Sequence, residues 1–286
     1  MIAFPNAKIN LGLNITAKRS DGYHNLETVF YPIALNDVLE IIPAEEIKLQ
    51  SSGLPVEGDQ ANNLCVQAYL ALKEKFPAVS SVAIYLHKHI PPGAGLGGGS
   101  SDAAFMLQLL CRKFSLDLSS EALSDIAAGL GSDCPFFIQN KPCLGQGRGE
   151  LLRPVSLNLE NYSIVLVHSG INISTAWAFG RIKPAIPAKS VLEIVSQPVE
   201  TWKNELINDF EGPVFREYPE LGELKEMLYR SGAIYASMTG SGSSLYGIFD
   251  RKNIPKEGLL KHHRLPVAVD IISRPGVIFP TSKSIS

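Results

Sequence analysis

A glycine-rich run is the part of this sequence whose residue types point most directly to chemistry. Five of the seven residues from Gly93 to Gly99 are glycines, and Ser100 and Ser101 follow them. Glycine costs about 0.5–1 kcal/mol of backbone entropy per position, so the run needs a reason. Glycines before a helix let main-chain amides approach an anion, and the helix N-terminus adds roughly half a positive charge. The run predicts a polyphosphate cradle, with the serine hydroxyls, Ser101 in particular, available to Mg²⁺. A flexible loop or a close packing site is the competing interpretation.

Three familiar glycine motifs do not explain this run. Gly93, Gly95 and Gly98 satisfy G-x-G-x-x-G, but a dinucleotide site needs a following strand and an acidic residue about 20 positions on. Two helical patterns follow here instead. The Walker motif needs a lysine where Gly99 stands. A protein kinase needs H-R-D and D-F-G, and neither tripeptide occurs in the chain.

A fourth pattern fits the run and its surroundings. P-x-x-x-G-L-G-G-G-S-S-D-A resembles the phosphate loop of the GHMP small-molecule kinases. "PNAKINLGL" is similar to the first strand motif of that superfamily, and "MTGSGSSLYGIF" to its third, a glycine loop that approaches the nucleotide phosphates. The resemblance implies an α+β, two-lobed GHMP kinase fold with its active site in the cleft between the lobes. We expect an N-terminal lobe over residues 1–153 and a C-terminal lobe over 154–286.

Three further segments narrow the choice within the superfamily. "RSDGYHNLETVF", "GSDCPFF" and "GQGRGE" resemble the branch that phosphorylates 4-diphosphocytidyl-2-C-methyl-D-erythritol. The match covers essentially the whole chain, with 183–200 and the last few residues the least informative. It implies transfer of the γ-phosphate of ATP, with Mg²⁺, to the tertiary 2-hydroxyl of that substrate in non-mevalonate isoprenoid precursor synthesis.

The resemblance assigns the chemistry to Asp133 and Lys8. Asp133 follows a helix end and precedes a proline-directed turn, so a turn former and a fixed carboxylate are both possible from the residues alone. The family places its catalytic aspartate here, and such a base is worth about 10²–10⁴-fold. Lys8 would hold Asp133 ionised and stabilise the transferring phosphoryl group, whereas a solvated lysine is the alternative. Whether Asp133 acts as a full base or orients the hydroxyl stays open.

The resemblance also assigns the contacts to the cytidine end. The equivalents of Tyr23 and Phe179 sandwich cytosine, and that of His24 bonds its edge; stacking on a base is worth about 1–3 kcal/mol. A core role for Phe179 is the alternative, with Trp177 as a competing aromatic. The other substrate-side positions are Asn10, Phe30, Thr175, Gly240, Ser241 and Gly242.

For ATP, the resemblance points to two groups of residues. Asn63, Leu64 and Lys88 are expected beside the adenosine, although the neighbouring Asn62 is a plausible helix cap. The phosphates are expected against Pro91, Gly93, Ala94, Gly95, Leu96, Gly97, Gly98, Gly99, Ser100 and Ser101.

The elements that must position these residues mix strands and helices without regular alternation, which favours an α+β fold. "AKINLGLNIT" alternates and predicts a half-buried strand with Lys8 and Asn10 on the same side. Ser119 or Ser120 is expected to cap a helix, and 133–139 is expected to be a loop. Strands are predicted over 37–42, 81–87, 162–168 and 267–273, with strand pieces over 142–152 and strand–turn–strand over 232–249. Helices are predicted over 63–76, 101–114, 119–131, 202–217 and 219–231.

Composition limits the class of protein. The 286 residues are 45% apolar and 19% charged, with a net charge of -2, so a globular core is expected and no basic excess points to nucleic acid. No apolar run approaches the roughly 20 residues of a membrane span, and no targeting segment is apparent. The four cysteines form no C-x-x-C pair and suggest buried thiols in a reducing cytoplasm. We expect a cytoplasmic monomer or homodimer with a small-molecule substrate and no metal held by protein carboxylates.

Other functions leave residues unexplained. Another GHMP kinase, acting on homoserine or mevalonate, would have no use for the Tyr23, His24 and Phe179 cluster, since neither substrate carries a base. A non-catalytic ligand sensor on the same fold would be favoured if Lys8 or Asp133 were missing, and both are present.

Overall fold

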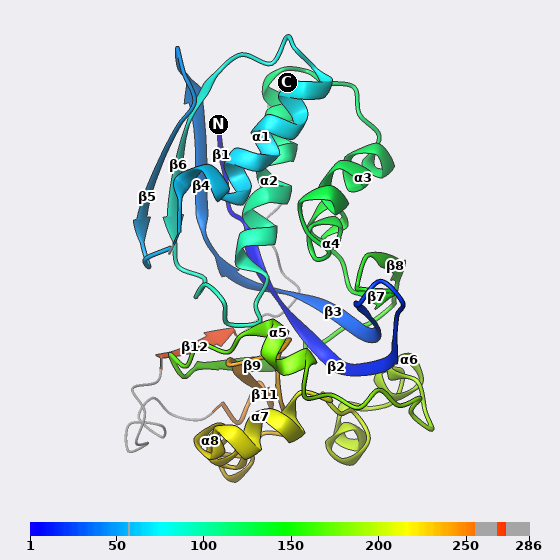
Figure 1. Cartoon of the computed structure of the whole chain (residues 1–286). Helices are drawn as coiled ribbons and strands as arrows, with labels where there is room; N and C mark the ends of the chain where they lie inside the picture. The colour runs from blue at the N-terminus through cyan, green and yellow to red at the C-terminus, as the bar shows by residue number, and fades with distance from the viewer. Residues whose placement is uncertain (57, 255–267, 273–286) are drawn as a thin grey trace.

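A sheet built on two long antiparallel strands crosses the middle of the molecule. Its order is β2-β3-β7-β8, and all of its pairs are antiparallel. The strands are β2 (Asn6–Lys18), β3 (His24–Asn36), β7 (Cys143–Gln146) and β8 (Leu151–Pro154). In Figure 1, β2 and β3 run diagonally between an upper and a lower group of elements. The computed structural model describes residues 1–56, 58–254 and 268–272.

The upper group is a second sheet with helices packed on one face. Its order is β1-β4-β6-β5, and only the β5–β6 pair is parallel. Its strands are β1 (Ile2–Ala3), β4 (Val38–Pro43), β5 (Lys48–Gly53) and β6 (Val82–Lys88). The helices are η1 (Gln60–Asn62), α1 (Leu64–Lys75), α2 (Gly98–Lys113), α3 (Ser120–Leu130) and α4 (Cys134–Gln139). Apolar side chains of α1 and α2 share one core with β4 and β6.

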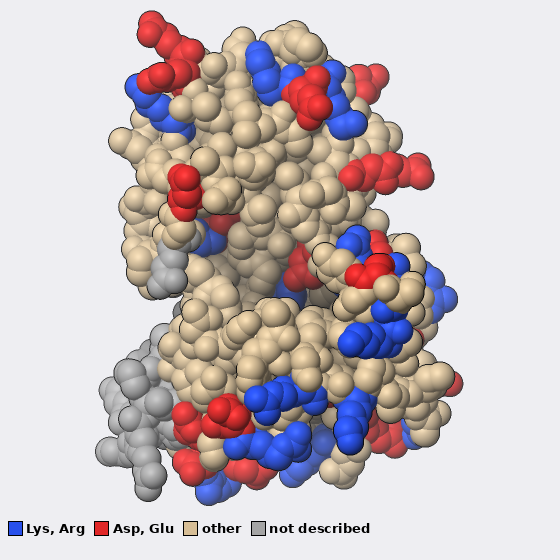
Figure 2. All heavy atoms as spheres, in the orientation of Figure 1, with Lys and Arg blue, Asp and Glu red and all other residues tan. Residues whose placement is uncertain are grey.

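The lower group is a third, antiparallel sheet of order β10-β11-β9-β12. Its strands are β9 (Tyr162–His168), β10 (Tyr235–Met238), β11 (Leu245–Asp250) and β12 (Ala268–Ile272). The helices are α5 (Thr175–Phe179), α6 (Val191–Val195), η2 (Val199–Asn204), α7 (Glu211–Glu217) and α8 (Pro219–Arg230). One face packs against α7 and α8, and the other faces the apolar side of β2 and β3. Figure 2 shows that the surface is hollowed between the upper and lower parts.

The prediction that β2 is half-buried is wrong, because both of its faces are buried. The apolar face, with Ile9 and Leu11, lies in the central core. The polar face is covered as well, and Lys8 and Asn10 are only 3% and 2% exposed. The loops that carry the glycines lie over this face and remove it from water. The expected shared side is confirmed, since Lys8 Nζ donates to Asn10 Oδ1 at 2.6 Å.

Several predicted elements are confirmed, and the exceptions have local reasons. Ser119 caps α3, its hydroxyl accepting from the Ala122 amide. The expected loop over 133–139 is instead the short helix α4, whose first turn accommodates Pro135 and which ends at Asn140 in the left-handed conformation. The helix expected from 202 begins only at Glu211, after η2. The long strand β3 was not expected. The α+β class is confirmed.

No helix in the described part of the chain is both long and apolar enough to cross a membrane.

Candidate active site

The glycine loop joins β6 to α2 and needs glycine for steric reasons. Gly95 and Gly97 have φ angles of +78° and +71°, a region that side chains rarely tolerate. A Cβ on Gly95 would overlap the carbonyl oxygen of Thr239, and one on Gly97 would lie 3.2 Å from Lys8 Cε. Ala94 and Leu96, between them, are buried in the central core. The loop is therefore held in one conformation, so the flexible-loop interpretation does not apply.

The hydrogen bonds of the loop leave its amides available. Its carbonyls are used: Leu96 O accepts from Lys8 N at 3.0 Å, and Gly95 O accepts from Lys8 Nζ at 2.9 Å. The amides from Gly93 to Ser100 have no hydrogen-bond partner among the described residues. Free amides at a helix N-terminus form an anion site. The geometry thus fits the predicted polyphosphate cradle.

The three sequence motifs meet at Gly95. Thr239 Oγ1 donates to Gly95 O at 3.1 Å and accepts from Asn10 N at 3.0 Å. A Cβ on Gly240 would lie 3.0 Å from Gly95 Cα, so the two glycine loops touch through their backbones. Segments more than 140 residues apart in the sequence therefore form one site.

Lys8 and Asp133 lie opposite each other beside this junction. Lys8 Nζ is 3.7 Å from Asp133 Oδ2, and the side chains are 4% and 31% exposed. Burial lowers the pKa of Lys8, an effect that the nearby Asp133 carboxylate opposes. Asp133 stands at the start of α4, where its side chain makes no capping hydrogen bond. Its carboxylate is therefore fixed by position yet remains available to a ligand.

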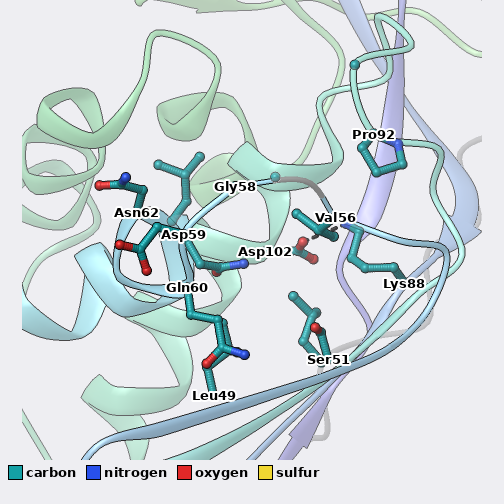
Figure 3. A pocket seen from close by; sticks show the side chains of 15 residues that line it. Leu49, Ser51, Val56, Gly58, Asp59, Gln60, Asn62, Lys88, Pro92 and Asp102 are labelled. Carbon is teal, nitrogen blue, oxygen red and sulfur yellow. Dashed lines mark hydrogen bonds and ion pairs between the residues drawn. The ribbon is translucent and has the colours of Figure 1, made fainter.

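A pocket of about 300 Å³ lies beside the glycine loop, and the described residues that line it all belong to the upper part. Figure 3 shows Lys88 and Asp102 side by side at this pocket, with Ser51 and Val56 nearby. Of the residues expected beside the adenosine, Asn63, Leu64 and Lys88 all line it. Asn63, not Asn62, caps α1, its Oδ1 accepting from Cys65 N at 2.9 Å.

A second pocket, of about 820 Å³, lies between α3, α5 and the hairpin of β2 and β3. Tyr23, His24, Thr175 and Phe179 line it, as expected, whereas Trp177 does not. The ring that stacks on Phe179 is that of His24, at 5.1 Å between centroids. Burial, followed by the charge of Lys18, lowers the pKa of His24.

A residue of the third motif contacts the wall of this pocket, and a cation lies in it. Thr175 Oγ1 and Ser241 Oγ lie 3.1 Å apart in a hydrogen bond, which links α5 to the C-terminal glycine loop. The Arg148 guanidinium lies 5.1 Å over the Tyr23 ring. Arg148 was part of the quoted "GQGRGE" segment but was not assigned a role, although a lone cation between glycines was a usable signal.

Two expected substrate residues are placed differently. The described hydrogen bonds of the Asn10 amide go to Lys8, Thr28 and Thr239, so it orients Lys8 from within the protein. Phe30 is 2% exposed and packs against Phe136, with Lys8 Nζ 5.6 Å from its ring centroid. Phe30 is therefore a buried apolar neighbour of the Lys8 ammonium.

Asp37 and Asp102, which the sequence analysis missed, pair with Lys88 and are almost fully buried. Burial raises the pKa of Asp102 to about 8, with the opposing charge of Lys88 reducing the effect. Asp102 follows Ser101 in the quoted motif, but only the fold reveals its partner. No group of three metal-ligating His, Cys, Asp or Glu residues occurs in the part of the chain that the structure describes.

The fold and the phosphate-loop geometry define a kinase of the GHMP class. Residues 63–141 match the GHMP kinases N terminal domain and residues 197–262 match the GHMP kinases C terminal domain. The 4-diphosphocytidyl-2-C-methyl-D-erythritol kinase of Bacteroides fragilis is 55% identical over 91% of this chain and 95% of its own length. The chain therefore belongs to the 4-diphosphocytidyl-2-C-methyl-D-erythritol kinase family.

Solved structures agree with this assignment. A crystal structure of 4-(cytidine 5'-diphospho)-2C-methyl-D-erythritol kinase has a TM-score of 0.78 at 31% identity, covering 95% of this chain and 98% of that chain. The mevalonate kinase of Methanococcus jannaschii has a TM-score of 0.69 at 13% identity, covering 96% and 98% of the two chains. At that identity the second likeness concerns the fold alone.

Proposed function

We propose that this enzyme transfers the γ-phosphate of ATP to the 2-hydroxyl of 4-diphosphocytidyl-2-C-methyl-D-erythritol, a step in isoprenoid precursor synthesis. One observation carries the proposal: Lys8 and Asp133 face each other at 3.7 Å, beside a glycine loop with free amides. The family membership supplies the acceptor, since relatives with this name cover nearly the whole chain.

The reaction needs few protein groups. The substrate hydroxyl gives its proton to the Asp133 carboxylate as its oxygen bonds to the γ-phosphorus, and the bond to the ADP oxygen breaks. Lys8 stabilises negative charge on the phosphoryl oxygens, at a position fixed by Asn10 and Gly95. Positioning and charge neutralisation dominate phosphoryl transfer. Lys8 and Asp133 are thus the proposed catalytic residues.

The nucleotide side follows from the first pocket. Asn63, Leu64 and the end of β6 at Lys88 would surround the adenosine, and the amides from Gly93 to Ser100 would bind the phosphates. Ser101 Oγ is buried without a partner, which fits the proposal that it holds Mg²⁺. Mg²⁺ bound there would neutralise charge on the triphosphate.

The acceptor side follows from the charge of the second pocket. Lys18 and Arg148 are among the residues that line it, and no Asp or Glu of the described chain does. This lining fits the diphosphate of the acceptor. Tyr23, Phe179 and His24 offer ring faces and a ring nitrogen to cytosine, while Thr175, bonded to Ser241 of the third motif, also lines the pocket.

We also propose the organisation that the sequence suggested. A boundary near residue 153 is supported by the described strands that follow β8, which join the lower sheet. The four unpaired cysteines suit a reducing cytoplasm.

The test is a coupled ADP-release assay with three candidate acceptors. We expect turnover with 4-diphosphocytidyl-2-C-methyl-D-erythritol and only background with homoserine or mevalonate. Omitting Mg²⁺ should abolish turnover. Equal rates with homoserine or mevalonate, or none with the cytidylylated acceptor, would refute the assignment.

A further inference from the structure

A buried ionic cluster forms part of the wall of the nucleotide pocket. It consists of Asp37, Lys88 and Asp102, which are 0%, 4% and 3% exposed. Lys88 Nζ donates to Asp102 Oδ2 at 2.6 Å and also to Asp37 Oδ2. Figure 3 shows that Lys88 and Asp102 point toward each other from β6 and α2. The three groups come from three separate parts of the upper sheet and its helices.

Asp37 holds the start of the glycine loop through its other oxygen. Asp37 Oδ1 accepts from the amides of His89 and Ile90 at 2.6 and 2.8 Å, the first two residues after β6. Its own amide donates to Pro5 O at 2.8 Å, which ties it to the segment before β2. The entry of the loop is therefore fixed by one buried carboxylate.

Asp37 is also connected to the end of the loop, because it shares Lys88 with Asp102. Asp102, the other partner of Lys88, lies on α2, the helix that begins where the loop ends. Close approach is possible because residue 98 is glycine: a Cβ there would lie 3.3 Å from Lys88 Nζ and 2.9 Å from Ile90 Cγ2. Residues that hold the start and the end of the loop, Asp37 and Asp102, thus bind the same Lys88 ammonium.

The charge of the cluster argues against a direct role in binding phosphate. One ammonium faces two carboxyl groups, so the cluster has no excess positive charge to offer an anion. Removing one partner of such a buried group leaves the others uncompensated. We propose that Asp37 is a positioning residue for the glycine loop, acting directly on its first amides and, through Lys88, on the helix that ends it. This inference rests on the proposed function, because it assumes that the loop binds ATP.

The test separates ATP binding from turnover in two variants. In Asp37→Ala we expect the KM for ATP to rise about tenfold or more, since a loop that must be ordered on binding binds more weakly. We expect kcat and the KM for the acceptor to change less than about threefold. In Asp37→Asn an oxygen remains for the two amides but the charge opposite Lys88 is lost, so we expect a smaller rise of about threefold in the KM for ATP.

Asp209→Ala is the matched control. Asp209 Oδ2 also accepts a backbone amide, that of Ile15 at 2.7 Å, but at the far end of β2. Its removal should lower the melting temperature and leave the KM for ATP unchanged. A purely structural role for Asp37 would give the same result as this control.

The outcomes are distinct. An Asp37→Ala enzyme whose KM for ATP stays within twofold of wild type, or whose two KM values rise equally, overturns the inference. If Asp37→Ala is not obtained folded, an unchanged KM for ATP in Asp37→Asn overturns the part that acts through Lys88. A wild-type enzyme without turnover on the cytidylylated acceptor instead refutes the proposed function.

Discussion

The glycine loop and the second pocket are built in opposite ways. The glycine loop offers main-chain amides, and its ends are held in place by the buried Asp37, Lys88 and Asp102 cluster. The other depends on side chains at the surface, including Tyr23, which is 57% exposed. A main-chain cradle can bind any polyphosphate of suitable shape, whereas side chains distinguish one base from another. We therefore expect the choice of acceptor to depend on the second, more exposed pocket.

The largest expected effect concerns Asp133, the carboxylate that faces Lys8. Asp133→Asn should lower kcat by at least about 100-fold, because an amide does not accept the hydroxyl proton. ATP binding should persist, as measured by calorimetry. Asp125→Asn, an exposed change on α3, is the control and should turn over normally. Near wild-type turnover in Asp133→Asn would remove the proposed base.

The next effect tests how rigid the glycine loop must be. Gly95→Ala should lower the free energy of unfolding by about 2 kcal/mol or more and weaken ATP, since its Cβ would overlap Thr239 O and its φ angle is +78°. Gly129→Ala on α3 is the matched control. No atom lies within 4 Å of its Cβ, so its stability should stay equal or rise slightly. Equal melting temperatures for the two variants would show that the loop tolerates displacement.

A smaller effect should be confined to the exposed pocket. Tyr23→Ala should raise the KM for the acceptor about tenfold, the value of one stacking contact, without changing the KM for ATP. Tyr85→Ala, a partly exposed tyrosine on β6, is the control for a general loss of aromatic surface. Equal losses for both substrates in Tyr23→Ala would contradict the separation of the pockets.

The smallest effect is a pH dependence that should be specific to the acceptor. The pKa of His24 lies below its ordinary value of 6.5, mainly because of burial and then because of Lys18. The ring is therefore neutral at pH 7, and the KM for the acceptor should rise a few-fold as pH falls through the folded pKa. The unfolded chain binds the His24 proton at a higher pH than the folded protein does. The free energy of unfolding should therefore also fall as the pH is lowered through the folded pKa. His24→Asn should flatten the acceptor profile and leave that of ATP unchanged.

The sequence predicted the elements that local patterns define. Alternation located β2, and the continuous apolar run of β9 was predicted at its observed bounds. The prediction was wrong where burial depends on distant parts of the chain. The alternation in β2 predicts a half-buried strand, because no local pattern shows that distant loops cover Lys8 and Asn10. The helix α4 was read as a loop because its proline is also a turn signal.

The candidate site could be predicted only as far as the motifs reached. Tyr23, His24, Thr175 and Phe179 line the second pocket, and each lies in a segment quoted from the sequence, whereas Asn10 and Phe30 lie in the interior. Asp37 could not be found in this way, since it stands alone between two strands and gains its partners from residues 51 to 53 positions away. Arg148 needed the fold to bring it over Tyr23.

The contact between Gly95 and the backbone at Thr239 and Gly240 means that the glycine loop depends on the C-terminal part of the chain. The described residues that line the first pocket all lie between positions 49 and 102, yet the glycine loop beside it contacts the backbone near residue 240. An isolated N-terminal half would keep the lining and lose this contact. We therefore expect substitutions in the C-terminal sheet that displace the backbone at Thr239 or Gly240 to weaken ATP binding.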